Sequence, residues 1–166
     1  AALISHRERL SGRVEYVREL MRYMNVHSYG KVLNNHAFPG VDEGYSSKQK
    51  LLRSYKFVLA FENSICHDYV TEKLFQPLLT GCVPVYRGAP NVEDFVPGDH
   101  CYINAADFAS PRHLAEYLQH LNTDETAYAE YFAWKTRPLR AGFLRLLEMV
   151  SESAGTRLCR LLQARQ

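Results

Sequence analysis

The sequence of 166 residues contains little cysteine and no long apolar run. Its cysteines, Cys66, Cys82, Cys101 and Cys159, lie far apart and form no Cys-x-x-Cys pair. This spacing argues against a zinc site or a scaffold held by many disulfides. No apolar run is long enough to cross a bilayer, and no signal sequence is visible. Because the chain begins with Ala1 and not methionine, we expect a fragment whose membrane anchor belonged to a missing N-terminal part.

The sequence also lacks an excess of charge of either sign. Its 20 lysines and arginines stand against 18 aspartates and glutamates, so the formal net charge is +2. That charge is too small to indicate a nucleic-acid or anionic-membrane partner. Walker A and G-x-G-x-x-G loops, which serve triphosphates and dinucleotides, are absent, as is the D-x-D motif typical of a metal-held diphosphate. Any anion site in this protein must therefore be local.

What the sequence does contain is an alternation of strand and helix patterns, within a length typical of one domain. We expect strands, some of them short, at residues 1–5, 25–32, 55–63, 81–88 and 100–108. We expect helices at 11–24 with Ser11 as the cap, a short basic helix before residue 54, a helix after Tyr69, a helical hairpin over 110–135, and C-terminal helices over 142–166. Pro77 should kink the helix after Tyr69 or mark a restart.

This order of elements predicts an open parallel sheet with right-handed crossovers, flanked by helices. In such a sheet, ligands bind in the crevice beyond the carboxyl ends of the strands. The loops over 5–13, 63–69 and 87–91 follow three of the expected strands and should face one crevice. The residues expected to line it are Arg13, Asn63, Tyr69, Glu72, Lys73 and the turn Gly88-Ala89-Pro90.

The residue types at this crevice indicate a nucleotide-sugar. Lys73 stands in the first turn of its helix, where a cation is unfavourable unless an anion is nearby. Arg13, Lys73 and the N–H groups of helix N-termini suit a diphosphate. Glu72 can accept hydrogen bonds from sugar hydroxyls, and Tyr69 offers a flat face. We therefore expect a variant without Lys73 to lose anion binding and to keep or gain stability.

Each of these residues also has a plain structural interpretation. Lys73 can be a solvated surface lysine, and Arg13 can pair with a glutamate of its own helix. Glu72 can simply favour the helix dipole. Tyr69 and Asn63 can serve as core packing and as a loop cap.

The stretch YKFVLAFENSICHDYVTEKLFQPLLTGCVPVYRGAPNVEDFVP, residues 55–97, closely resembles the donor-binding motif of α1,3/4-fucosyltransferases. The upstream segments SGRVEYVREL and VHSYGKVLNN are similar to those that precede the motif in that family. The resemblance implies a GT-B glycosyltransferase with two Rossmann-like lobes. It implies further that residues 1–166 form a single GDP-fucose-binding domain, the C-terminal lobe, without the N-terminal acceptor lobe.

The resemblance also implies roles for the crevice residues. Arg13 and Lys73 would neutralise the pyrophosphate of GDP-fucose, and Glu72 would bind ribose or fucose hydroxyls. Tyr69 would lie against the nucleotide, and Asn63 would hold the phosphate–fucose end. Further donor-site candidates are Tyr86, Gly88, Ala89 and Asn91.

The reaction implied is inverting transfer of fucose to a glycan hydroxyl, in an α1,3 linkage to an N-glycan core or lactosamine on a glycoprotein. The base would be a carboxylate of the absent lobe, and neither a metal nor another cofactor would be required. Eukaryotic members of the family are type II membrane proteins of the Golgi with a lumenal catalytic domain. Two other readings stay open: a non-catalytic nucleotide-sugar-binding module, and an interaction protein that has kept the fold without the ligand.

Overall fold

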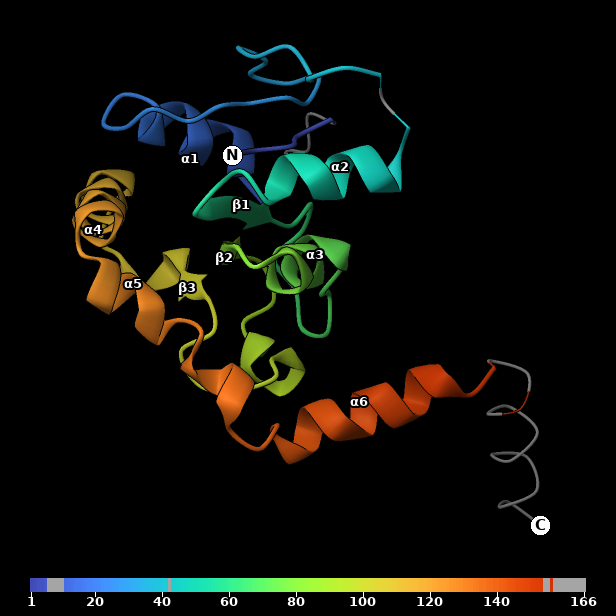
Figure 1. The fold of residues 1–166 in the computed structure, drawn as a ribbon. Coiled ribbons are helices and arrows are strands. Elements are labelled where there is room, and N and C mark those ends of the chain that lie inside the picture. The colour runs from blue at the N-terminus through green and yellow to red at the C-terminus, as the bar shows by residue number, and fades with distance from the viewer. Residues whose placement is uncertain (6–10, 42, 154–155, 157–166) are drawn as a thin grey trace.

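The computed structural model describes residues 1–5, 11–41, 43–153 and 156. At its centre is a parallel sheet of β1 (Phe57–Phe61), β2 (Val83–Arg87) and β3 (Ile103–Asn104), in that order (Figure 1). Leu59 lies opposite Val85, which in turn lies opposite Ile103. The expected open parallel sheet is confirmed.

The N-terminal segment continues this sheet beyond β1. Ala2 forms parallel bridges to both Leu59 and Ser28. Backbone hydrogen bonds run from Leu59 N to the Ala1 carbonyl (2.8 Å) and from Tyr29 N to the Ala2 carbonyl (3.0 Å). The strands expected at 1–5 and 25–32 therefore lie where they were predicted, but the structure contains only isolated β-bridges there. Across the sheet the chain order reverses between the N-terminal segment and β1, which is the kind of position where open α/β sheets bind ligands.

Helices cover both faces of the sheet. One face packs against α1 (Arg13–Leu20) and α4 (Pro111–Thr123), and the other against α2 (Tyr45–Leu52) and α3 (Glu72–Thr80). The side chains of β1 explain which helices pack on which face, because successive side chains of a strand point to opposite faces. Phe61 packs with the first pair of helices, while Ala60 packs with Leu74 of α3. The result is a three-layer arrangement (Figure 1).

The α3 helix begins and ends at well-defined caps. The Thr71 side chain accepts a hydrogen bond from Lys73 N (3.4 Å), and Gly81 ends the helix with φ 81°. The helix runs through Pro77 and does not restart there, in contrast to one of the two expectations. Proline removes its own N–H from the ladder and crowds the carbonyl four residues before it, and this helix of 9 residues, with a cap at each end, tolerates that cost.

The C-terminal half differs in detail from the sequence pattern. β3 has only two residues and leads into η2 (Ala105–Asp107). The second arm of the expected hairpin divides into α5 (Glu125–Glu130) and the 3₁₀ turn η3 (Ala133–Thr136).

A last helix, α6 (Ala141–Ser151), lies below the sheet against η1 (Val92–Phe95) (Figure 1). The Arg140 guanidinium fixes its start, because it pairs with Glu93 and Asp99. The C-terminal helix expected beyond α6, and Cys159, lie outside the described residues. Among the described helices, none is long and apolar enough to cross a membrane.

Candidate functional site

A polar cavity of about 520 Å³ lies where the chain order of the sheet reverses, beyond the carboxyl end of β1. The N-terminal segment, the loop before α2, α2 itself, the end of β1 and the first turns of α1 and α3 all contribute to its wall. The described lining residues are Leu3, Ser5, Arg13, Tyr29, Gly30, Phe38, Gly44, Lys48, Asn63, Glu72 and Lys73. The cavity thus brings together Arg13, Asn63, Glu72 and Lys73, which the sequence analysis placed at one crevice.

Arg13 is positioned by the start of α1. The N-cap is Gly12, in a left-handed conformation with φ 61°, and not Ser11 as expected. Ser11 still accepts a hydrogen bond from Arg13 N (3.4 Å). The Arg13 side chain is 2% exposed, and its Nη1 donates to the Phe61 carbonyl (3.2 Å) and to Asn63 Oδ1. Arg13 is therefore held against the end of β1, where it reaches the cavity.

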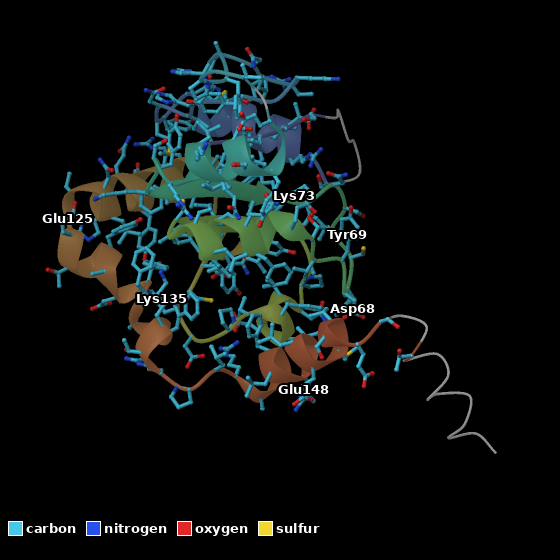
Figure 2. The ribbon with its side chains drawn as sticks, turned by 45° about the vertical axis from the view of Figure 1, so that its right-hand side comes forward. Asp68, Tyr69, Lys73, Glu125, Lys135 and Glu148 are labelled. Atoms are coloured by element: carbon cyan, nitrogen blue, oxygen red, sulfur yellow. The ribbon has the colours of Figure 1, made fainter. Side chains whose placement is uncertain are left out.

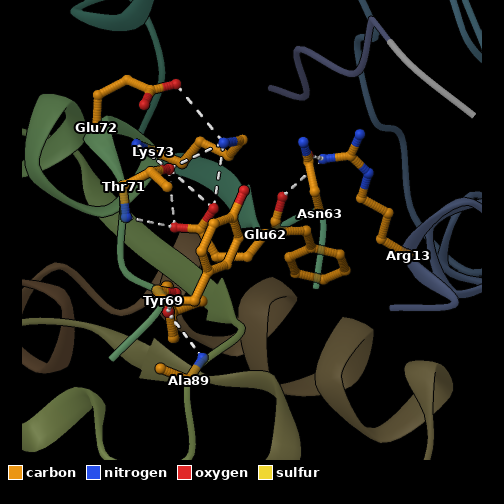
Figure 3. A network of polar contacts seen from close by, with 10 residues as sticks. Arg13, Glu62, Asn63, Tyr69, Thr71, Glu72, Lys73 and Ala89 are labelled. Carbon is orange, nitrogen blue, oxygen red and sulfur yellow. Dashed lines mark hydrogen bonds and ion pairs between the residues drawn. The ribbon is translucent and has the colours of Figure 1, made fainter. Parts of the chain in front are cut away.

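Lys73 has a protein anion beside it, which the sequence analysis did not foresee. Its ammonium donates to Glu62 Oε2 (3.1 Å) and to Thr71 Oγ1 (2.9 Å). Glu62 is fully buried and also accepts hydrogen bonds from Thr71 N and Thr71 Oγ1. Figure 3 shows this network, with Asn63 between Lys73 and Arg13. The cation in the first turn of α3 is thus neutralised by the residue that follows β1, so removal of Lys73 would leave a buried carboxylate without its charged partner.

Electrostatic coupling extends from Lys73 to the rim of the cavity. Glu72 Oε1 lies 3.6 Å from Lys73 Nζ, and the Glu72 side chain is 56% exposed. Partial burial acts to raise the pKa of Glu72, but Lys73, its hydrogen bonds and Lys48 together outweigh burial and lower it. For Lys48 on α2, burial lowers the pKa, with Glu72 acting in the opposite direction. Glu72 is therefore ionised, and Lys48 is a partly desolvated cation.

The other predicted donor-site residues do not line the cavity. The Tyr86 hydroxyl accepts a hydrogen bond from Ala89 N (2.9 Å) and donates to the Tyr69 carbonyl (3.5 Å). Burial raises the pKa of Tyr86 to about 12. Tyr69 itself is half-buried and lies on the same side of the molecule as Lys73 (Figure 2). These residues hold the loops beneath the site, and their contact with a ligand stays a prediction.

Gly88 and Asn91 also secure these loops. A Cβ atom on Gly88 would lie 2.3 Å from the Tyr86 hydroxyl and 2.6 Å from Glu62 Cγ, so the backbone passes close to both side chains. Asn91 exchanges hydrogen bonds with Asp68, through Asn91 Nδ2 to Asp68 Oδ1 (2.8 Å) and Asp68 N to Asn91 Oδ1 (3.0 Å). The turn after β2 is thereby tied to the loop after β1.

Sequence reasoning missed Tyr29, Phe38 and Lys48. The two aromatic rings line the cavity with centroids 6.2 Å apart, and Tyr29 is hydrogen-bonded to the Tyr55 hydroxyl. The strand expected at 25–32 placed Tyr29 inside the sheet, whereas Tyr29 in fact follows the bridge residue Ser28 at the carboxyl end of the sheet. Phe38 and Lys48 reach the cavity because the loop before α2, and α2 itself, pack beside it. No local sequence pattern predicts that packing.

The arrangement can bind an anion with hydroxyl groups. Cations meet at the first turns of α1 and α3, and one exposed carboxylate lies beside them. Aromatic faces line the opposite part of the wall. Within the described ranges, no group of three His, Cys, Asp or Glu side chains is placed to hold a metal ion.

Known proteins with similar sequences are fucosyltransferases. "GDP-fucose protein O-fucosyltransferase 3" of Bos taurus is 43% identical over 132 residues, which cover 76% of this chain and 28% of that protein. The Xenopus laevis protein of the same name is 45% identical over 132 residues, covering 75% and 28%. The chain therefore spans little more than a quarter of the length of these curated relatives.

Solved structures with a similar fold are also fucosyltransferases. An α1,3-fucosyltransferase with GDP superposes with a TM-score of 0.68 at 26% identity, covering 80% of this chain and 37% of that one. An α1,3-fucosyltransferase with GDP-fucose gives a TM-score of 0.67 at 25% identity, with the same coverage. The family described as "Glycosyltransferase family 10 (fucosyltransferase) C-term" matches residues 1–166. The chain belongs to glycosyltransferase family 10, the fucosyltransferases, as a member of its C-terminal domain family.

Proposed function

We propose that the protein transfers fucose from GDP-fucose to an acceptor hydroxyl, and that this chain is its donor-binding part. The observation that carries the proposal is the cavity at the reversal of the sheet, where Arg13, Lys73 and Glu72 converge in a member of this family. Relatives solved with GDP and with GDP-fucose share the fold of most of the chain.

The lining residues suggest how the donor is held. The diphosphate lies between Arg13 and Lys73, at the positive end of the α3 helix dipole. Glu72 accepts hydrogen bonds from ribose or fucose hydroxyls. Tyr29 and Phe38 offer faces for the base, and stacking of a base on an aromatic ring contributes roughly 1–3 kcal/mol. Asn63 lies beside Arg13, where it can orient the end of the diphosphate that carries fucose.

The chemistry proposed is an inverting displacement at the anomeric carbon of fucose. The acceptor oxygen forms its bond to this carbon while the bond to the phosphate oxygen breaks, and GDP departs with the electron pair. Arg13, Lys73 and the first turn of α3 stabilise the charge that develops on GDP. This scheme needs no metal ion and no further cofactor. The base that takes the acceptor proton is expected from outside this chain.

The names of the relatives suggest two classes of acceptor. The curated relatives are named protein O-fucosyltransferases and are 42–45% identical to this chain, whereas the solved α1,3-fucosyltransferases are 25–26% identical. This difference favours a serine or threonine hydroxyl of a protein over the N-glycan or lactosamine hydroxyl that the sequence motif suggested. A lumenal location in the Golgi, through a type II anchor, is proposed from the family resemblance.

Binding and transfer can be tested separately. Titration calorimetry of the complete protein should show tighter binding of GDP and GDP-fucose than of UDP. Transfer of labelled fucose should then be measured to folded protein domains and to N-glycan and lactosamine acceptors, with and without a chelator. Tighter binding of UDP would overturn the donor assignment. Binding of GDP-fucose without transfer to any acceptor would favour a binding module.

A further inference from the structure

Lys48 is the cation of the cavity that the established motif does not use. It stands in the second turn of α2, a helix that precedes β1 in the chain and packs against α3. Its side chain is half-buried and lines the same cavity as Arg13 and Lys73. Lys50, two residues further along α2, is exposed and lines none of the cavities described.

The three cations differ in their protein partners. Lys73 is paired with the buried Glu62, and Arg13 is hydrogen-bonded to the Phe61 carbonyl and to Asn63. In the part of the chain that the structure describes, the Lys48 ammonium makes no hydrogen bond and no ion pair within 4 Å. It interacts over a longer distance with Glu72, favourably, and with Lys73, unfavourably. Among the three cations, Lys48 is therefore the one whose charged group has no close partner within the described residues.

A half-buried ammonium without a close partner costs free energy. Burial removes part of its hydration, and that loss is offset only when an anion or a hydrogen-bond acceptor takes the place of water. Cavity walls with such uncompensated charge are typical of sites that are completed by a ligand of opposite charge. An exposed lysine, such as Lys50, keeps its hydration and has no such desolvation cost.

We propose that Lys48 is a third anion-binding residue of this site and contacts the diphosphate of the nucleotide directly. The inference rests on the proposed function, because it takes a nucleoside diphosphate as the occupant of the cavity. It assigns α2 a role that the donor motif does not contain: α2 closes the diphosphate site from the side opposite Arg13's helix. Lys48 then adds positive charge that Lys73, neutralised by Glu62, supplies only in part.

The test compares four variants of the complete protein by titration calorimetry with inorganic pyrophosphate and with GDP. K48M and K48Q remove the charge, K48R keeps it, and K50M is the matched control on the same helix. We expect K48M and K48Q to weaken both ligands about 10- to 100-fold, as for loss of a charge-assisted hydrogen bond. K48R and K50M should stay close to the unmodified protein. Thermal denaturation without ligand should show K48M unchanged or more stable, because a desolvated cation is gone.

The outcomes separate this inference from the proposed function. If K48M binds pyrophosphate as tightly as the unmodified protein, or if K50M loses as much affinity as K48M, the role of Lys48 is refuted. If the unmodified protein prefers UDP to GDP, the donor assignment fails. The pyrophosphate titrations would still decide whether Lys48 binds the diphosphate.

Discussion

At the scale of single residues, the central feature is that Lys73 is placed both for a ligand and for the fold. Its side chain is 23% exposed and lines the cavity, yet it also neutralises the fully buried Glu62. The sequence predicted the ligand role, because a lysine in the first turn of a helix needs an anion. It did not reveal that Glu62, the residue after β1, supplies one, because the direction of the Glu62 side chain depends on how the end of the strand meets α3.

Lys73→Met is therefore expected to lower both nucleotide affinity and stability. Removal of one partner of a buried ion pair leaves an uncompensated buried charge and costs about 3–5 kcal/mol, so we expect the free energy of unfolding to fall by about that amount in urea denaturation. This replaces the expectation from sequence that the variant keeps or gains stability. As a control, the double variant E62Q/K73M should recover part of the loss, since both charges are then absent. Unchanged stability of Lys73→Met would show that the ion pair contributes nothing to the fold.

Other predicted donor-site residues have a clear structural role, and their contact with a ligand stays a prediction. Tyr86 and Gly88 belong to the donor motif, yet the first is buried and the second leaves no room for a side chain beside Glu62. A motif records that residues occur together and does not separate those that touch the ligand from those that support them. Arg13, Glu72 and Lys73 line one cavity, as the position of their loops at the carboxyl edge of a parallel sheet predicted, and their contact with the donor stays a prediction.

At the scale of elements, the N-terminal segment and the loop after Ser28 form one wall of the cavity by unusually close approach. A Cβ atom on Gly30 would lie 2.1 Å from the Ile4 carbonyl oxygen and 2.4 Å from Ile4 N. Val32 N also donates to that carbonyl (2.9 Å). Glycine at this position therefore allows the two segments to lie side by side and brings Tyr29 to the site.

Gly30→Ala should separate these two segments. The new methyl group meets backbone atoms that cannot rotate away, so we expect a loss of about 1–3 kcal/mol in the free energy of unfolding, as for an overpacked core. GDP affinity should fall as well, because Ser5 and Tyr29 flank the contact. Thermal denaturation and calorimetry measure the two effects. Gly142→Ala is the control, since the atom nearest to its Cβ would be the Asp94 carbonyl oxygen at 3.4 Å. Equal stability of the two variants would contradict the packing argument.

The order of the elements was largely predictable, but their lengths were not. The apolar run before Asn63 indicated β1 because a strand buried on both faces has few polar residues. The segments around Ala2 and Ser28 have the right position but form bridges, because only a few of their backbone groups align. The uninterrupted path of α3 through Pro77 depended on its two caps and its packing against β1 and β2.

At the scale of the whole molecule, this chain corresponds to only part of its relatives. It covers 28% of the curated fucosyltransferases and 37% of the solved ones. Among the described residues that line the cavity, Glu72 is the one carboxylate. Its pKa is lowered, mainly because Lys73 and the other favourable contacts outweigh its partial burial. A carboxylate with a lowered pKa is a weak base, and Glu72 lies among the cations that we propose to bind the donor.

We accordingly expect residues 1–166, produced alone, to bind GDP-fucose without transferring fucose. Loss of a general base costs roughly 10²–10⁴-fold in rate, and loss of acceptor positioning adds to it, because a bound and oriented acceptor removes much of the entropic barrier. Labelled fucose transfer to protein and glycan acceptors should therefore stay at background, while calorimetry on the same sample shows GDP binding. The complete protein, assayed in parallel with the same acceptors, is the positive control. Glycoside formed by residues 1–166 alone would place the base within this chain, and Glu72→Gln would then show whether Glu72 provides it.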